Sequence, residues 1–493
     1  DASRFFVGRQ WVGDTVDLAG LERLRGDHLR RILAADLSKP LAIALALDTL
    51  MCRPMNKEAD EAWQKTWQPI EQEKLINRKV DSYGSKKVVE IELSNGVSGV
   101  DLEGHDGLYA LIRSQGRPLG CVTLINQNGS GVITAMTLLQ AIAKDLGEIA
   151  IRLAWTPPLS TPPAWPPITV IVCTRNRTVQ LAECLRALFD LDYPHYEIVV
   201  VDNAPTDDQT AQLAATLPVR YIRENRPGLD WARNCGLREA RYSIVAFTDD
   251  DVHPDRGWLR AIAQIFNDPE IMAVTGLVLP IQLETQAQNL FEFGYGGMKH
   301  GFERRVVRHL SHDDKMLLWA SAFGVGANMA FRKALLGKIG GFDVALDVGT
   351  PAGGGGDVEM FHRLVARGYT LVYEPAALVW HYHRPLMADL EKLVSNNGRS
   401  FGCYLFTCGR NHTVHWFAII YFALRFWLWD WLVKRMLNPI PGGFPRRLVW
   451  RELCTALSSP IAYLRSQTHA RRYAHLSESA IAMENPMAEK GGE

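Results

Sequence analysis

The feature that most constrains the fold is a series of four short apolar runs, each of which leads into polar residues. The runs span residues 167–172, 197–201, 219–222 and 243–247. Between the first two runs, Leu181, Leu185 and Leu188 have the spacing that is typical of helices, and residues 229–240 are predicted as a further helix. Short apolar runs that alternate with helices are typical of parallel strands buried on both faces. The pattern therefore predicts an α/β domain with an open, mainly parallel sheet.

Polar side chains follow the predicted strands at the points where they end. Thr174 follows the first strand, Asp202 follows the second, and three aspartates at 249–251 follow the fourth. Ligands of open α/β sheets bind outside the carboxyl ends of the strands, so we expect these residues to converge on one crevice. Three carboxylates there can hold Mg²⁺ or Mn²⁺, which usually keep substrate phosphates as further ligands. A solvated loop or a helix cap is the alternative interpretation, since Asp is common at both.

Four motifs in this region together resemble those of a family 2 glycosyltransferase with the GT-A fold. They are Thr-Arg-Asn-Arg at 174–177, Val-Asp-Asn at 201–203, the glycine-containing helix entry at 225–236, and the aspartate triplet. The resemblance implies that Asp251 holds a divalent cation, Mn²⁺ or Mg²⁺. It also implies that a nucleotide-sugar donor contacts Thr174, Arg175, Asn176, Arg177, Asp202, Asn203, Arg233, Asp249 and Asp250.

A glycine-rich segment at 353–359 continues the match and carries the predicted base. Inverting transfer needs a carboxylate that takes the proton from the acceptor hydroxyl. The family uses the aspartate of a Glu-Asp pair that opens a helix, and Asp357 matches it, with Glu359 as the alternative base. Gly356 stands where the family has the glutamate, a departure that affects whatever orientation this glutamate provides. The glycines fit either a flexible loop or backbone that approaches the donor sugar closely.

Two histidines, His381 and His383, follow an apolar segment and lie on the same side of an extended chain. The family places a carboxy-terminal histidine near the metal and the diphosphate. The resemblance assigns this role first to His381 and second to His383. A histidine after an apolar strand also serves as a capping or surface residue, which is the alternative.

Composition and patterning outside these motifs predict the domain organisation. A hairpin around residues 116–118 and a helix over 138–153 indicate a folded α+β accessory or oligomerisation domain, which is compatible with a homo-oligomer. The predicted parts are the accessory domain at 1–155, a Pro-rich linker at 156–166, the GT-A domain at 167–390, a helical membrane or acceptor region at 391–475, and a disordered tail at 476–493.

The overall charge and the cysteines exclude several classes of protein. The formal net charge of 0 lacks the basic excess expected of a nucleic-acid-binding protein. The 8 cysteines form no CxxC pair, so neither a zinc site nor a disulfide framework is indicated. We expect free thiols in a reducing, cytoplasmic compartment.

A Trp-rich segment at 416–431 predicts where the protein works. Its uncharged run, 416–424, is shorter than the roughly 20 residues that a membrane span needs, and Arg425 and Asp430 interrupt the segment. Such a helix is typical of the membrane interface, and the basic residues after it attract anionic lipid. We therefore expect peripheral association with the inner face of the cell membrane. A buried helix that packs on the catalytic domain is the alternative.

These features predict an inverting, metal-dependent glycosyltransferase that moves a sugar from a nucleotide sugar to a hydroxyl of a glycan or lipid-linked acceptor. A processive synthase is disfavoured because the sequence has no QxxRW motif and no transmembrane bundle. A nucleotidyltransferase is disfavoured because its glycine-rich first loop is absent. The alternative is a catalytically silent glycan-binding or scaffold protein with the same fold. Gly356 favours that alternative, whereas Asp251 and Asp357 argue against it.

Overall fold

The computed structural model describes residues 83–126, 129–154, 165–308, 314–437 and 444–484. They belong to two compact units, a smaller one between residues 86 and 154 and a larger one formed mainly by residues 165–484. Residues 1–82 and nearly all of the predicted Pro-rich linker lie outside the described residues. The bounds given above for the accessory domain and the linker therefore stay predictions.

The smaller unit combines a sheet with one long helix. Its sheet has the order β1-β3-β4, in which β1 pairs in parallel and β4 antiparallel with β3. Alternate residues of β3, among them Leu108 and Ile112, pack against Leu138 and Ile142 of α5 in one core. Two short strands, β2 and β5, form a separate ladder. The elements are β1 (Lys86–Glu92), η2 (Leu93–Asn95), β2 (Val100–Asp101), β3 (Gly107–Ser114), β4 (Arg117–Ile125), β5 (Val132–Ile133) and α5 (Ala135–Ala154). The predicted hairpin and helix are both present.

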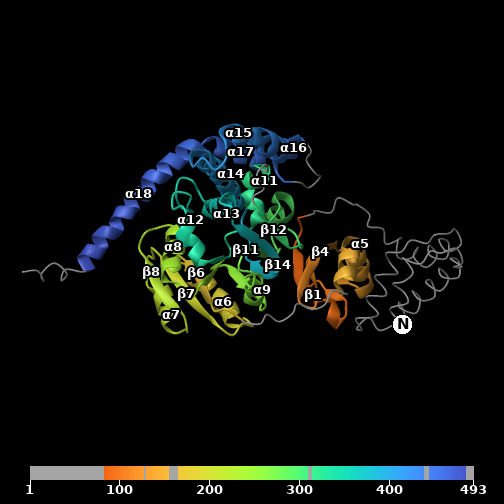
Figure 1. Cartoon of the computed structure of the whole chain (residues 1–493). Helices are drawn as coiled ribbons and strands as arrows, with labels where there is room; N and C mark the ends of the chain where they lie inside the picture. Colours follow the sequence, from red (N-terminus) through yellow and green to blue (C-terminus); the bar gives the residue numbers. More distant parts are fainter. Residues whose placement is uncertain (1–82, 127–128, 155–164, 309–313, 438–443, 485–493) are drawn as a thin grey trace, which may run out of the picture. The chain divides into compact units, whose positions relative to one another are not determined.

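The larger unit is built on a mixed sheet with the order β10-β14-β11-β13-β9-β6-β7-β8, and β12 pairs with β14 (Figure 1). The four predicted apolar runs form neighbouring parallel strands, and β13 runs antiparallel between β9 and β11. The strands are β6 (Ile168–Thr174), β7 (Tyr196–Asn203), β8 (Arg220–Glu224), β9 (Ile244–Asp249), β10 (Val252–Pro254), β11 (Ile271–Pro280), β12 (Arg305–Val307), β13 (Asn328–Arg332) and β14 (Thr370–His381). The predicted α/β class is confirmed.

Apolar cores lie on both faces of this sheet because successive strand residues point to opposite sides. In β6, Ile171 packs into one core, while Val170 and Val172 pack into the other. Helices and short turns cover the cores and carry the loops of the site. They are α6 (Thr178–Phe189), α7 (Gln209–Ala215), α8 (Leu229–Glu239), α9 (Trp258–Ile265), α10 (Gln286–Asn289), η3 (Leu290–Tyr295), α11 (Asp314–Leu318), η4 (Ala320–Phe323), α12 (Lys333–Ile339) and α13 (Gly356–Ala366).

The chain after β14 is helical, as predicted for residues 391–475. Its helices are α14 (Met387–Arg410), α15 (Trp416–Phe422), η5 (Ala423–Val433), α16 (Lys434–Leu437), α17 (Arg446–Leu457) and α18 (Ser459–Glu484). Figure 1 shows α18 extending away from the rest of this unit. α18 ends at Glu484, within the stretch 476–493 for which disorder is predicted, and the disordered tail stays a prediction. Ala and Glu, which favour helices, are frequent in that stretch.

The segments α15, η5 and α16 form one continuous helix, Trp416–Leu437. Among the described residues this helix alone is long and apolar enough, by length and composition, to cross a membrane. The helix thus extends beyond the predicted segment 416–431, while its uncharged run, 416–424, is as short as predicted. Arg425 and Asp430 interrupt the apolar pattern, but they form an ion pair with each other and the helix continues past both.

Candidate active site

A cavity of about 860 Å³ lies at the carboxyl ends of β6 and β9 in the larger unit. Strand ends from the sheet, the first turns of α8 and α13, and residues of the later helices line it. Most of the predicted site residues lie together in this lining: Thr174, Arg175, Arg177, Asn203, Arg233, Asp249, Asp250, Asp251, Asp357, His381 and His383. Thr174 and the aspartate triplet therefore share one crevice at the strand ends, as expected, because parallel strands deliver these loops to the same edge, but Asp202 does not line it.

Three predicted residues are outside the described lining of this cavity. Asn176 has a positive φ of 54° and accepts a hydrogen bond from the backbone N–H of Thr206. Asp202 is fully buried; one oxygen accepts from the hydroxyl of Tyr221 at 2.9 Å, and the other has no partner among the described residues. Glu359 is buried, and its carboxylate pairs with Arg363 at 2.8 Å. Glu359 thus does not line the cavity that holds Asp357.

Two arginine guanidinium groups and one hydroxyl contact the aspartate triplet. Arg177 donates to Asp250 at 2.6 Å and to Asp251 at 2.8 Å, and Thr174 Oγ1 donates to Asp250 at 2.7 Å. Burial raises the pKa of Asp250 to about 7, although Arg177 opposes that shift. Burial also raises the pKa of Asp249 to about 6, against the attraction of Arg233. The strand end therefore holds several carboxylates close together. Arg177 and Arg233 offset their burial only in part, so a further cation would be favourable there.

The two histidines have different surroundings. His381 Nε2 lies 3.5 Å from Asp251 Oδ1, because β14 pairs with β10 in a register that places His381 opposite Val252. His383 places one ring nitrogen 3.0 Å from His381 Nδ1 and the other 3.3 Å from Glu292. Burial lowers the pKa of His381 to about 4, so its imidazole is neutral near pH 7. His381 faces the triplet, whereas both nitrogens of His383 face other side chains.

The residues around Asp251 are compatible with a divalent cation that shares its ligands with substrate. Asp251 and His381 offer one oxygen and one nitrogen close together. No group of three or more His, Cys, Asp or Glu side chains within the described ranges is arranged to hold a metal by itself. Mg²⁺ is commonly bound through one or two carboxylates together with phosphate and water oxygens. The donor atoms therefore fit a cation that is completed by a diphosphate.

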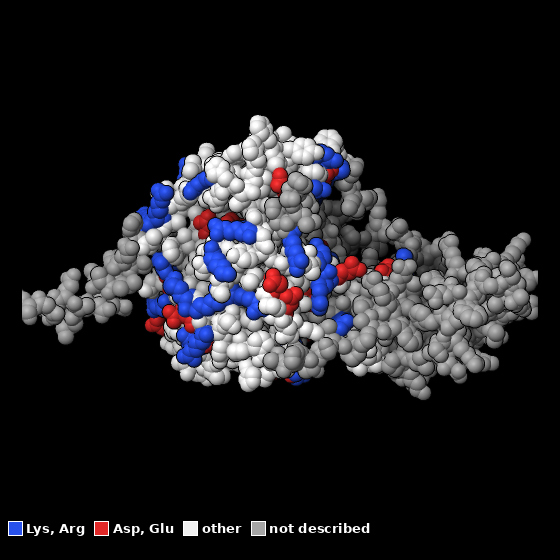
Figure 2. Space-filling view, viewed as in Figure 1, with Lys and Arg blue, Asp and Glu red and all other residues white. Residues whose placement is uncertain are grey.

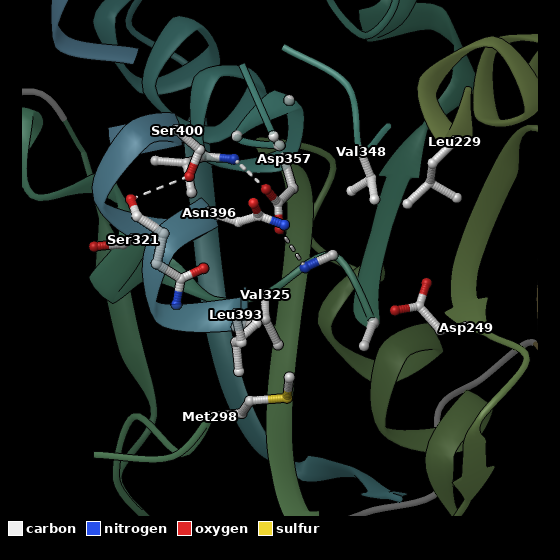
Figure 3. A pocket seen from close by; sticks show the side chains of 18 of the residues that line it. Leu229, Asp249, Met298, Ser321, Val325, Val348, Asp357, Leu393, Asn396 and Ser400 are labelled. Atoms are coloured by element: carbon white, nitrogen blue, oxygen red, sulfur yellow. Dashed lines mark hydrogen bonds between the residues drawn. The ribbon is translucent and has the colours of Figure 1, made fainter. Parts of the chain in front are cut away.

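Asp357 lies in the first turn of α13 and is oriented by two backbone amides. Its Oδ2 accepts from the N–H of Gly326 at 2.7 Å, and its Oδ1 accepts from the N–H of Val358 at 2.9 Å. Figure 3 shows Asp249 and Asp357 reaching toward the cavity from different elements. A Cβ added to Gly326 would lie 2.6 Å from Arg233 Nη2 and 2.9 Å from Asp357 Oδ2. Because Gly326 has no side chain, the guanidinium of Arg233 and the carboxylate of Asp357 can both lie next to it.

Two aspartates near the site were missed in the sequence. Asp347 accepts from the backbone N–H groups of Leu229 and Asp230 at 2.7 and 2.9 Å, so it caps α8, whose own cap residue is a glycine. Asp230 pairs with Arg233 at 3.1 Å. Asp230 had a local signal in the sequence, because it is three residues from Arg233 and residues three apart on a helix are neighbours. Asp347 had none, since it is more than 100 residues away from the helix that it caps.

The end of the cavity away from the triplet is aromatic. Trp319, Phe401, Trp427 and Trp431 line it, and the rings of Phe401 and Trp427 lie 6.1 Å apart. Trp431 Nε1 donates to Glu452 at 3.0 Å. Polar side chains of α14, Asn396, Asn397 and Ser400, also line the cavity. This end therefore has the apolar walls and few polar groups that are typical of ligand sites.

Comparison with known proteins gives a consistent result for the sheet region. Residues 169–340 match the family model described as glycosyl transferase family 2. The pre-mycofactocin glycosyltransferase of Mycobacterium tuberculosis is 27% identical over 236 residues, 46% of each chain. Glycosyltransferase AglE of Haloferax volcanii is 26% identical over 237 residues, 46% of this chain and 70% of the relative. The chain thus spans about half the length of the first of these curated relatives.

Two further proteins show the range of the similarity. The O-antigen chain rhamnosyltransferase WbaN of Salmonella anatum is 26% identical over 227 residues, 44% of this chain and 67% of the relative. Among solved structures, the mannosyltransferase PcManGT of Pyrobaculum calidifontis, in complex with GDP-Man and Mn²⁺, is 20% identical. The similarity covers 68% of this chain and 86% of that one, with a TM-score of 0.36. The family resemblance that the motifs indicated is confirmed for residues 169–340.

Proposed function

We propose that this chain, whose residues 169–340 form a family 2 glycosyltransferase domain, is an inverting glycosyltransferase that moves a sugar from a nucleotide sugar to a hydroxyl acceptor. One observation carries the proposal. The aspartate triplet and Asp357, which come from different elements, line a single cavity together with Arg177, Arg233 and His381. Carboxylates of two kinds are needed for this reaction, some to hold the charged donor through a cation and one to take a proton.

The donor is proposed to occupy the half of the cavity at the strand ends. Arg177 and Arg233 supply positive charge there, and both are already fixed by aspartates. Asn203 at the end of β7 lines the cavity, whereas Asp202, which precedes it, is fully buried outside the lining. A divalent cation at Asp251 and His381 would neutralise the departing diphosphate.

Asp357 is proposed as the base. Its two oxygens are held by backbone amides, so the side chain is pre-oriented and does not need to rotate before reaction. The remaining electron pairs of the carboxylate face the cavity, where they would accept the acceptor's proton as its oxygen attacks the anomeric carbon. Glu359 is less suitable, because its carboxylate is buried and paired with Arg363.

The aromatic end of the cavity is proposed to bind the acceptor. Apolar walls with a few amide and hydroxyl groups suit either the faces of sugar rings or the apolar part of a lipid-linked sugar. The same helices form the outer surface of the unit next to this end. The helix Trp416–Leu437 packs Ile419, Phe422 and Leu432 inward and leaves Phe417 and Trp429 79% and 51% exposed.

We propose that this outer surface lies on the cytoplasmic face of the membrane. Figure 2 shows few charged side chains over the region where Figure 1 places α15 and α17, and Lys and Arg side chains near its edges. Trp450, Leu457, Ile461 and Leu464 of α17 and α18 are also exposed. A helix that packs on its protein along one side and exposes aromatic residues on the other is suited to lie in the interface plane. Peripheral binding would bring a lipid-linked acceptor close to the cavity.

The alternative function is a glycan-binding or scaffold protein without activity, for which Gly356 is the supporting observation. One experiment separates the two. Purified protein is incubated with each of a panel of nucleotide sugars and a mixed lipid and glycan acceptor fraction, with Mn²⁺, Mg²⁺ or EDTA, and release of nucleoside diphosphate is measured. We expect metal-dependent release with one donor and its loss in Asp357→Asn. Binding of a nucleotide sugar without any release, in every acceptor fraction, would favour the silent protein.

A further inference from the structure

The carboxylate of Asp230 occupies the space that a side chain at position 356 would enter. A Cβ built on Gly356 would lie 1.9 Å from Asp230 Oδ2 and 2.8 Å from its Cγ. Non-bonded heavy atoms are normally about 3.5–4.0 Å apart, so such a side chain requires Asp230 to move. The φ of Gly356 is not positive, unlike those of Gly353, Gly354 and Gly355. Lack of space, and not backbone strain, therefore requires glycine at 356.

Asp230 is held in this position by α8 and by its neighbours. Its side chain is 2% exposed, and Arg233 donates to it at 3.1 Å. The first turn of α8 is itself fixed by Asp347, which accepts from the N–H groups of Leu229 and Asp230. A side chain anchored at both its backbone and its carboxylate does not move aside easily. Its location next to α13 is thus a stable feature of the fold.

Arg233 connects Asp230 to the two parts of the site. Its side chain is 7% exposed, and its Nη2 lies 3.7 Å from Asp249 Oδ1. Its Nη2 and Oδ2 of Asp357 would lie 2.6 and 2.9 Å from a Cβ built on Gly326, so both groups lie next to that residue. Burial alone would lower the pKa of Arg233, but the attraction of Asp230, Asp249 and Asp357 raises it. The guanidinium is therefore a charged centre that three carboxylates share.

Asp230 also lies at the amino-terminal end of α13, where a negative charge is favourable, and this position and Arg233 oppose the rise in its pKa that burial and the neighbouring Asp347 cause. The residue that caps this helix, Gly355, has no side chain that could accept from the first N–H groups. Aligned peptide dipoles make that end of a helix positive, and a carboxylate there is stabilising. Asp357 is in the same first turn. The residue before Asp357 in α13 is Gly356, which has no carboxylate. Asp230 of α8 places its carboxylate at that position instead.

We propose that Asp230 is a positioning residue for the reaction, which supplies from α8 the acidic partner that Asp357 lacks at position 356. The inference rests on the proposed transferase function. Asp230 lies in the lining of the cavity, but its carboxylate is directed at Arg233 and at the first turn of α13. It fixes the guanidinium of Arg233 and the first turn of α13, and these two together set the direction in which Asp357 faces the acceptor hydroxyl.

The test moves the carboxylate from one helix to the other. The variants are Asp230→Asn, Asp230→Ala, Gly356→Asp, and the double variant Asp230→Ala with Gly356→Asp. Asp192→Asn, at an exposed ion pair with Arg260, is the matched control. We expect kcat to fall by roughly 10- to 100-fold in Asp230→Asn, a typical loss for residues that orient a site. The KM for the donor should change by a smaller factor than kcat, because Arg233 loses its contact with Asp230 but keeps the one with Asp249.

The double variant is the decisive member of the set. In Asp230→Ala the space beside position 356 is vacated, so the carboxylate introduced by Gly356→Asp can take the former position of the Asp230 oxygens. We expect kcat to recover to within about threefold of the parent chain, whereas each single change lowers it. Wild-type kcat in Asp230→Asn would overturn the proposal. So would a double variant that folds, binds donor and stays as slow as Asp230→Ala.

Thermal unfolding separates failure of this inference from failure of the proposed function. Gly356→Asp alone should unfold at a lower temperature than the double variant, because only in the single variant do the two carboxylates compete for one space. This comparison does not depend on activity. If the parent chain shows no transfer with any donor, the proposed function fails. If Gly356→Asp alone is as stable as the double variant, the positional inference fails.

Discussion

The two ends of the cavity differ in their chemistry and in how the chain builds them. The proposed donor end consists of carboxylates and guanidinium groups at the ends of β6 and β9 and in the first turns of α8 and α13, and nearly every charge there has a bonded partner. The proposed acceptor end consists of Trp319 and of rings from α14 and η5, shaped by packing. Charged groups stabilise a transition state only when they are held in advance, whereas apolar walls need only the right shape.

The largest effect is expected from Asp251→Ala, which tests whether the donor end depends on a cation. Transfer should fall below detection, and binding of nucleoside diphosphate should lose its dependence on Mn²⁺ or Mg²⁺, because an oxygen ligand is removed. Titration calorimetry with and without the metal measures this, with exposed Asp192→Ala as the control. An unchanged affinity in the presence of metal would contradict the assignment.

The next effect concerns the base at the junction of the two ends. Asp357→Asn keeps the shape and one acceptor oxygen, but it cannot take the proton. We expect kcat to fall by roughly 10²-fold or more, the usual scale for a general base, while donor binding persists. Glu359→Gln is the matched comparison, and we expect it to act on stability, because Glu359 pairs with Arg363. Normal turnover in Asp357→Asn together with an inactive Glu359→Gln would reverse the two roles.

The acceptor end can be tested by a pair of tryptophans two residues apart. Trp427 lines the cavity, whereas Trp429 is 51% exposed on the outer surface. Trp427→Ala should raise the KM for the acceptor by about tenfold, which corresponds to the loss of about 1.4 kcal/mol of apolar contact. The donor KM should be unchanged. Trp429→Ala serves as the control in this assay, and equal effects of both variants would argue against an aromatic acceptor site.

In a membrane-binding assay the roles of the two tryptophans should be reversed, because Trp429 lies on the outer surface. Phe417→Ser with Trp429→Ser should weaken flotation with anionic vesicles by several-fold, while Trp427→Ala should leave it unchanged. The intact chain should bind anionic vesicles better than neutral ones, and more weakly as the salt concentration rises. Absence of the intact chain from the floating fraction at low salt would contradict membrane association.

The last prediction concerns the pH dependence of stability at the proposed donor end, where no activity is measured. Burial raises the pKa of Asp250 to about 7, well above its value of about 3.9 in an unfolded chain. The folded state therefore holds this proton more tightly, and the stabilisation is present at low pH and is lost as pH rises through about 7. Relative to Asp250→Asn, the free energy of unfolding in EDTA should decrease between about pH 4 and 7, by at most about 1.4 kcal/mol per pH unit. A constant difference would show that the pKa of Asp250 is not shifted.

The sheet could be predicted from the sequence because its signals are local. The four apolar runs form β6, β7, β8 and β9, since continuous apolar runs that are too short for helices and alternate with helical segments are typical of buried parallel strands. Thr174 and the aspartate triplet each follow a predicted strand directly, so the sequence also placed them at the same edge of the sheet. Local signals alone do not fix where the tail begins, because a polar composition indicates disorder from residue 476 while α18 ends at Glu484.

What the sequence by itself determined was therefore the set of elements, the parallel strand region and the strand-end residues that meet there. Only the tertiary structure decided how individual side chains are partnered. It turned His383 toward Glu292, paired Glu359 with Arg363 and placed Asp230 in the space beside Gly356. The physical reason is that periodicity and turn chemistry act over a few residues. Contacts between α8 and α13, more than 100 residues apart, depend on how whole elements pack, and no short pattern encodes them.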